Sequence, residues 1–207
     1  MSKDLFNINR IKSALDQYIG DKITSDFDLN KDLSPVKPKL RDAAVLIPII
    51  IRPDGLNIIL TKRSNNLQHH PGQIAFPGGK VDGLDNSLID TALREAHEEI
   101  GLMQKNVEIL GLLPKHETIT NFKVTPVVGL VDSSYQPRIE PGEVDEIFEV
   151  PFTSITNSKN FQINYRVWGK HKRGYYSMPY GPYYIWGATA RIMRMFCDIL
   201  DEFNETK

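Results

Sequence analysis

The segment from residue 76 to residue 102 constrains the fold most, because it joins a glycine turn to an amphipathic helix. Pro77, Gly78 and Gly79 predict a turn that would break a helix or a central strand. A helix is expected over residues 87–100, with Ser87 as its N-cap and Gly101 as its stop. One apolar stripe of this helix should face the core, formed by Ile89, Ala92, Leu93, Ala96 and Ile100.

Three glutamates fall on a different arc of the same helix, namely Glu95, Glu98 and Glu99. Carboxylates at this spacing repel one another by about 0.2–0.5 kcal/mol per pair on an exposed helix, so a positive partner is expected. Arg94 is one candidate. A divalent cation is another, because carboxylate oxygens suit Mg²⁺ or Mn²⁺. Most glutamate-rich helix faces are only solvated surface, so this pattern alone does not establish a metal site.

The whole segment resembles the Nudix box, G-x5-E-x7-R-E-U-x-E-E-x-G-U, in which U is a bulky aliphatic residue. The matching residues are Gly79, Arg94, Glu95, Glu98, Glu99, Gly101 and Leu102. Ala96 stands at the first U position. Asp85 lies where the first glutamate of the motif should be, and the interval from Asp85 to Arg94 is one residue too long.

The preceding residues, 60–79, read LTKRSNNLQHHPGQIAFPGG. They resemble the segment that marks coenzyme A pyrophosphatases within the Nudix family, L-L-T-x-R-S-x3-R-x3-G-x3-F-P-G-G. The residues in register are Leu60, Thr61, Arg63, Ser64, Gly72, Phe76, Pro77, Gly78 and Gly79, and Ile59 replaces the first leucine. Gln68 stands where the pattern has an arginine, and glutamine lacks the charge with which arginine binds phosphate bidentately.

The resemblance implies metal-dependent hydrolysis of the diphosphate bond of coenzyme A and its derivatives, giving 4′-phosphopantetheine and adenosine 3′,5′-bisphosphate. It implies Mg²⁺ or Mn²⁺ as cofactor, with Glu95, Glu98 and Glu99 as metal ligands. The expected catalytic residues are Glu98, Glu99 and Arg94, with Arg94 orienting the carboxylates. The expected substrate-binding residues are Arg63, Ser64, Gly72, Phe76, Gly78 and Gly79.

Several assignments stay open. Glu98 is either a further ligand or a general base acting through water, and Glu117, Glu143 and Glu146 are other candidate bases that the sequence does not rank. Arg63 is the matched candidate for the 3′-phosphate of the substrate, with Lys62, Lys115 and Arg166 as weaker ones. The tyrosines between residues 175 and 184 are available to stack on adenine, although core or interface packing explains them equally well.

Two other functions compete with the first. A Nudix hydrolase of another nucleoside diphosphate derivative, such as ADP-ribose or a dinucleotide, is favoured by Gln68. A Nudix-shaped binding module without catalysis belongs to a different class. The retained Glu95, Glu98 and Glu99 argue against it, because such a module has no need of three repelling carboxylates.

Composition narrows the class of protein. The 207 residues are 41% hydrophobic and 25% charged, which suits one sizeable core, and the net charge of −1 gives no basic field for nucleic acid. A single cysteine, Cys197, excludes an internal disulfide and fits a reducing compartment. No apolar run is long enough for a bilayer. We therefore expect a cytoplasmic protein with a small-molecule diphosphate substrate and no membrane partner, and a homodimer is left open.

The order of elements predicts an α+β fold, and the resemblance implies a Nudix-type α/β/α sandwich with a mixed β-sheet. Residues 1–40 should form an N-terminal helix, over 5–19, and an extended linker, and residues 41–207 the Nudix hydrolase domain. Strands are expected at 43–51, 56–60, 73–76, 107–113, 123–131, 161–168 and 183–186. Pro53, Asp54 and Gly55 should form a hairpin turn. A last helix should span 189–203, with a buried face formed by Ile192, Met195, Phe196, Ile199, Leu200 and Phe203.

Overall fold

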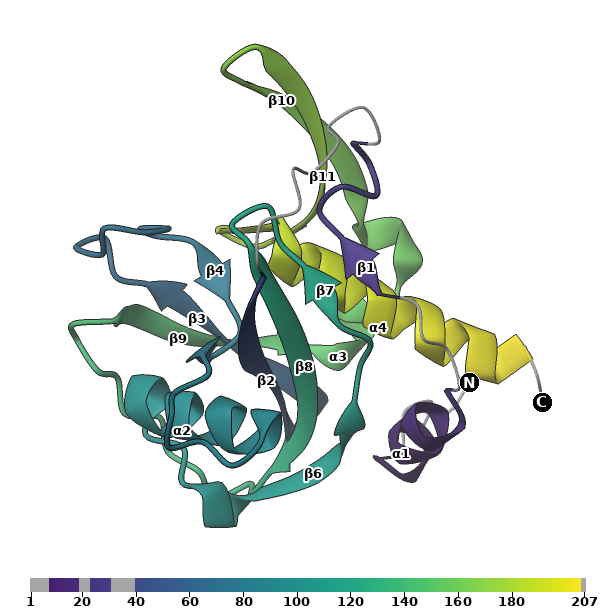
Figure 1. Cartoon of the computed structure of the whole chain (residues 1–207). Coiled ribbons are helices and arrows are strands. Elements are labelled where there is room, and N and C mark those ends of the chain that lie inside the picture. Colours follow the sequence, from purple (N-terminus) through teal and green to yellow (C-terminus); the bar gives the residue numbers. More distant parts are fainter. Residues whose placement is uncertain (1–7, 19–22, 31–39, 206–207) are drawn as a thin grey trace.

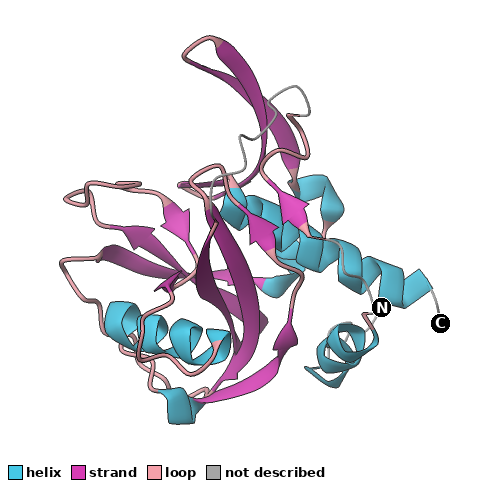
Figure 2. Cartoon of the chain, viewed as in Figure 1, coloured by secondary structure: helices cyan, strands magenta, loops and turns pink. Residues whose placement is uncertain are grey.

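The computed structural model describes residues 8–18, 23–30 and 40–205, in which helices cover both faces of a large mixed sheet (Figures 1 and 2). The parts of the predicted N-terminal helix and linker at 5–7, 19–22 and 31–39 lie outside these residues. The predicted α+β class and the sandwich of helices around a mixed sheet are confirmed. No helix in the described part of the chain is long and apolar enough to cross a membrane.

The large sheet is built around β2, whose neighbours β3 and β8 run antiparallel and parallel to it, respectively. Its strand order is β1-β7-β8-β2-β3-β4, with β5 also paired to β2, β6 to β8 and β9 to β3. The bounds are β1 Thr24–Ser25, β2 Arg41–Arg52, β3 Gly55–Arg63, β4 Ile74–Ala75, β5 Gly78–Lys80, β6 Val107–Leu112, β7 His116–Glu117, β8 Phe122–Val131 and β9 Val144–Pro151. The predicted turn at Pro53 to Gly55 joins β2 to β3.

The side chains of β2 alternate between two hydrophobic cores, as a strand buried on both faces requires. Ala43, Ile47 and Ile49 enter one core with the C-terminal helix. Ala44, Leu46 and Ile50 enter the other, under the acidic helix. The sheet therefore separates the acidic helix from the C-terminal helix.

The acidic helix, α2, spans Leu88–Ile100 and has the two caps that the sequence predicts. The Ser87 hydroxyl accepts a hydrogen bond of 3.1 Å from the backbone N–H of Asp90. Gly101 adopts a left-handed conformation with φ of 70°, which glycine takes without a steric penalty. Short 3₁₀ turns, η1 Gln104–Asn106 and η2 Ser158–Asn160, occur elsewhere in the chain.

The other face of the sheet is covered by α4, Ala188–Glu205, together with α1, Ile8–Gln17, and α3, Phe152–Ile155. All six residues predicted for the buried face of the last helix are buried: Ile192, Met195, Phe196, Ile199, Leu200 and Phe203. Ile11, Ala14 and Leu15 bring α1 into the same core. The division of the chain at residue 40 stays a prediction, although α1 and β1 both pack on the residues that follow it.

The glycine turn was interpreted wrongly in one respect. Gly78, Gly79 and Lys80 form strand β5, antiparallel to residues 43–45 of β2, rather than a turn that ends a strand. The reason is steric: a side chain at Gly78 would overlap the Ala44 carbonyl oxygen, and one at Gly79 would overlap the carboxylate of α2 that packs there. Two glycines let β2 and α2 approach the same strand closely.

A second sheet packs on the core at one end, through Met178 and Ile185, while its β10–β11 hairpin projects from the body of the molecule (Figure 1). It is antiparallel, in the order β10-β11-β12, with β10 at Gln162–Trp168, β11 at His171–Tyr180 and β12 at Tyr183–Trp186. Strands β10 and β12 match the predicted ranges. Strand β11 was not predicted.

Candidate active site

Glu99 of α2 points into the protein, and its side chain is only 3% exposed. Its carboxylate accepts a hydrogen bond of 3.2 Å from the backbone N–H of Gly78 and lies 3.4 Å from the Arg63 guanidinium. Burial raises the pKa of Glu99 to about 8, although Arg63 and the Gly78 N–H act in the opposite direction. The contacts with Arg63 and Gly78 therefore do not fully offset the cost of burying the negative charge of Glu99.

Glu95 lies one helical turn before Glu99 and packs its carboxylate against the backbone of Gly79. Burial raises the pKa of Glu95, a hydrogen bond from Arg94 lowers it, and the charges of Glu98 and Glu143 raise it further. Gly79 therefore lets the backbone of β5 pass close to Glu95, because any side chain there would overlap the carboxylate.

Arg94 holds three carboxylates in place. It makes a bidentate ion pair with Asp85, at 2.9 and 3.0 Å, and donates to Glu95 at 2.9 Å and to Glu98 at 3.0 Å. It also donates to the carbonyl oxygen of Lys80 in β5. Arg94 therefore contacts three carboxylates at once, and its predicted role in orienting them for catalysis stays a prediction.

Asp85 is a residue whose role the motif match left unassigned. Its side chain is 4% exposed, and besides Arg94 it accepts hydrogen bonds from the Thr91 hydroxyl at 2.8 Å and the Asp82 N–H at 2.9 Å. The Arg94 hydrogen bonds hold the pKa of Asp85 far below its usual range. With these contacts Asp85 positions Arg94. The extra residue between the two is accommodated, since the pair still forms.

The structure distinguishes two of the three further glutamates considered as bases, Glu143 and Glu146. The charge of Glu143 raises the pKa of both Glu95 and Glu99, so Glu143 belongs to the same electrostatic site. The carbonyl oxygen of Glu143 accepts a hydrogen bond of 2.8 Å from the Ser64 N–H. Glu146 instead accepts the hydroxyl of Tyr183.

The oxygen donors of this site fit a divalent cation. Burial raises the pKa values of Glu95 and Glu99. A hard cation bound there would lower these pKa values again, because it favours the charged carboxylates. No three histidine, cysteine or acidic side chains are already gathered into a metal site in the described residues. Arg94 holds Glu95 and Glu98 instead. The ligand set Glu95, Glu98 and Glu99 therefore stays a prediction.

The other predicted substrate residues have structural contacts here. Phe76 is buried in the core shared with α4. The buried Ser64 hydroxyl accepts the N–H of Asn66, and Gly72 has a φ of 67° with Asn65 packed against it. Ser64 and Gly72 thus shape the loop between β3 and β4, and the predicted contact of all three residues with substrate stays a prediction.

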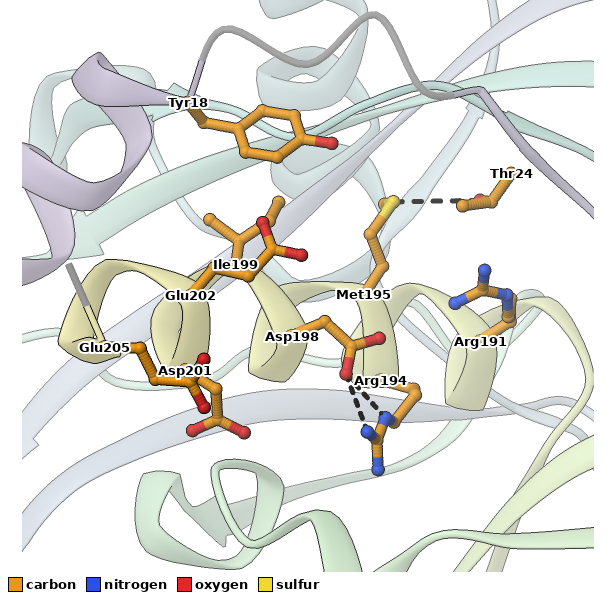
Figure 3. Close-up of a pocket in the computed structure, with 10 residues that line it drawn as sticks. All are labelled: Tyr18, Thr24, Arg191, Arg194, Met195, Asp198, Ile199, Asp201, Glu202 and Glu205. Atoms are coloured by element: carbon orange, nitrogen blue, oxygen red, sulfur yellow. Dashed lines mark hydrogen bonds and ion pairs between the residues drawn. The ribbon is translucent and has the colours of Figure 1, made fainter.

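A pocket of about 290 Å³ lies along α4 (Figure 3). None of its lining residues belongs to the glutamate site. Two arginines in its wall are paired, Arg194 with Asp198 at 2.7 Å and Arg191 with Asp28 at 3.3 Å. Both arginines of this pocket are therefore already paired with carboxylates.

The class of this protein is defined by its mixed sheet and by the packing of α2, with its glutamates, against the glycine-containing strand β5. The NUDIX domain matches residues 40–170, and the chain belongs to the Nudix family. It is a Nudix hydrolase. Among its relatives, "Uncharacterized Nudix hydrolase NudL" of Enterobacter sp. (strain 638) is 40% identical over 182 residues, which cover 83% of this chain and 94% of that protein.

The protein of the same name in Salmonella newport (strain SL254) is 41% identical over 155 residues, 74% of this chain and 80% of its own length. Among solved structures, the MutT protein of Methanosarcina mazei Go1 is 21% identical with a TM-score of 0.49, over 84% of this chain and 98% of that one.

Proposed function

We propose that this Nudix hydrolase cleaves the diphosphate bond of coenzyme A and its derivatives, with Mg²⁺ or Mn²⁺ as cofactor. One observation carries the proposal: Arg63, from the segment that resembles coenzyme A pyrophosphatases, contacts Glu99, from the Nudix helix, at 3.4 Å. Two residues that are 36 positions apart in the chain, one from each motif, thus lie at a single site. The substrate class follows from the resemblance, and the cytoplasmic location and the homodimer stay predictions from the sequence.

In this proposal Glu95, Glu98 and Glu99 would hold the cation. A divalent ion there would neutralise the diphosphate and make a bound water more acidic. Arg94 and Asp85 hold the carboxylates in register, as their ion pair indicates. The Arg63 guanidinium lies 3.4 Å from Glu99. When a substrate binds, this guanidinium would leave Glu99 and turn toward a phosphate oxygen.

Glu143 is our choice as the group that accepts the proton of the attacking water, with Glu98 as the alternative. Glu143 belongs to the same electrostatic site as Glu95 and Glu99 without bonding to Arg94 in the described residues. A Glu143→Gln variant should lower kcat by about 10²–10⁴-fold and remove the acidic limb of the pH–rate profile. An acidic limb that persists in this variant and vanishes in Glu98→Gln would transfer the role to Glu98.

The competing function is hydrolysis of another nucleoside diphosphate derivative, such as ADP-ribose or a dinucleotide. The observation that favours it is Gln68, where the resembled pattern carries a cationic side chain. A binding module without catalysis is disfavoured by the site itself, since burying Glu99 at a raised pKa destabilises a fold that does not use this carboxylate.

The test is a substrate panel of coenzyme A, ADP-ribose and dinucleotides, with Mg²⁺ or Mn²⁺ and chromatography of the products. We expect coenzyme A to be turned over fastest, and faster hydrolysis of ADP-ribose would overturn the substrate assignment. Glu99→Gln should reduce turnover by orders of magnitude. The matched control is Glu108→Gln, an exposed carboxylate of β6 paired with Lys12, which should keep normal activity. Near-normal turnover in Glu99→Gln would show that the ligand assignment is wrong.

A further inference from the structure

Positive charge is concentrated in one part of the chain. Residues 150–197 contain no aspartate or glutamate, so all 26 acidic residues lie elsewhere. The same stretch includes the second sheet and carries Lys159, Arg166, Lys170, Lys172, Arg173, Arg191 and Arg194. The hairpin of β10 and β11 projects from the body (Figure 1), so it forms a positive extension of a protein with a net charge of −1.

Two arginines face each other across this hairpin. Arg166 of β10 is the direct cross-strand partner of Arg173 of β11. Like charges in this position destabilise a sheet. No carboxylate in the described part of the chain pairs with either guanidinium. The Nε atom of Arg173 is also buried without a hydrogen-bond acceptor. An anion bound between the two side chains would offset the repulsion between the guanidinium groups and would give the Nε atom of Arg173 an acceptor.

An aromatic cluster lies on the same side of the sheet. Because side chains alternate along a strand, Trp168 and Tyr175 share the face of Arg166 and Arg173, and the β11–β12 register adds Trp186. Their ring centroids are 5.4 to 6.4 Å apart, and the Arg166 guanidinium lies 5.7 Å from the ring centre of Trp168. Indole and phenol rings of this kind provide surfaces on which a nucleobase stacks.

We propose that this face binds a phosphorylated nucleoside. The phosphate bridges Arg166 and Arg173, and the base stacks on the rings of Trp168, Tyr175 and Trp186. Guanidinium pairs suit a phosphate because their parallel N–H groups match its oxygens. The site lies on the second sheet and does not depend on the assignment of the catalytic glutamates. Its ligand is either a free nucleotide or the nucleotide part of a bound substrate, which present the same chemistry.

The chain supplies its own probe and its own control. Its only two tryptophans, Trp168 and Trp186, both belong to the proposed site, so intrinsic fluorescence reports on it directly. Lys172 is adjacent to Arg173 but points to the opposite face, where its ammonium lies 4.9 Å from the ring centre of Tyr165. Lys172→Gln therefore removes the same charge from the same strand without touching the site.

The experiment is a fluorescence titration of the full chain with adenosine 3′,5′-bisphosphate, inorganic phosphate or adenosine, in the presence of a chelator. We expect saturable quenching by the bisphosphate, weaker binding of phosphate or adenosine alone, and at least tenfold lower affinity in Arg173→Gln. Lys172→Gln should bind within about twofold of the wild type. No saturable signal, or equal weakening by both variants, would overturn the proposal. If Arg173→Gln melts at a lower temperature than the wild type, Arg166→Gln is used in its place, because position 166 is exposed.

Steady-state kinetics separate the two sources of the ligand. If the site holds the nucleotide part of the substrate, Arg173→Gln raises KM with kcat unchanged, and the bisphosphate competes with substrate. If the site holds a free nucleotide, KM stays the same while the fluorescence affinity falls. The titration needs no turnover, so a failure of the proposed hydrolytic activity would leave this test intact.

Discussion

Replacing Glu99 by glutamine should change how the stability of the metal-free protein depends on pH. Burial raises the pKa of Glu99 to about 8 from an ordinary value of 4.5. Between these two pH values the folded protein keeps a proton that the unfolded chain has released. The free energy of unfolding therefore falls as the pH rises through this window, and the loss is complete above about pH 8.

The size of this effect has an upper bound. The difference between pKa values of 8 and 4.5, at about 1.4 kcal/mol per pH unit, gives at most about 5 kcal/mol of destabilisation at alkaline pH. Glutamine at position 99 keeps an acceptor for the Gly78 N–H but has no proton to lose in this range. Glu99→Gln should therefore lose less stability than the wild type between pH 5 and pH 8.5.

The assay is urea denaturation in a chelator at several pH values, followed by circular dichroism. Glu98→Gln is the matched control, because it removes a half-exposed carboxylate from the same helix, and it should keep the wild-type slope. Mg²⁺ should stabilise the wild type more at pH 8.5 than at pH 5, since a cation binds the deprotonated carboxylate. Equal slopes for the wild type and Glu99→Gln would refute the reasoning.

Two further predictions concern glycine and core packing. Gly79→Ala should place a methyl group on the Glu95 carboxylate and reduce turnover at least tenfold, whereas Gly83→Ala, with no atom close to its new methyl group, should be nearly neutral in the same assay. Equal turnover in the two variants would contradict the close approach. Phe196→Ala removes a fully buried ring that packs edge-on against Phe152 and should cost about 3–5 kcal/mol in urea denaturation; a loss below 1 kcal/mol would argue against that packing.

Local signals in the sequence predicted the helices well. Ser87 and Gly101 define the ends of α2 because capping depends on a few neighbouring residues. The spacing of apolar residues likewise identified the buried face of α4. The spacing of residues also placed Glu95 and Glu99 on one arc of α2, but it did not predict how deeply their side chains are buried. The Glu99 carboxylate contacts Gly78 and Arg63, which lie outside the helix, so its burial depends on tertiary packing.

Contacts between distant segments were harder to predict. Strand β5 has two glycines and one lysine, so it has no apolar alternation, and its pairing with β2 is what makes it a strand. Strand β11 contains Gly174 and Pro179, which sequence rules treat as strand breakers, yet both positions pair within the sheet. Asp85 was left unassigned because its role depends on the position of Arg94 in space rather than on a fixed interval.

The placement of α1 and α4 affects how fragments of this chain would behave. The matched domain ends at residue 170, inside the β10–β11 hairpin, and excludes α1 and α4, two of the three helices that cover one side of the main sheet. A protein trimmed to residues 40–170 would leave Ile47, Ile49 and Ile58 facing water. Such a fragment should aggregate, so the segment that matches the NUDIX domain is shorter than the segment that the fold requires.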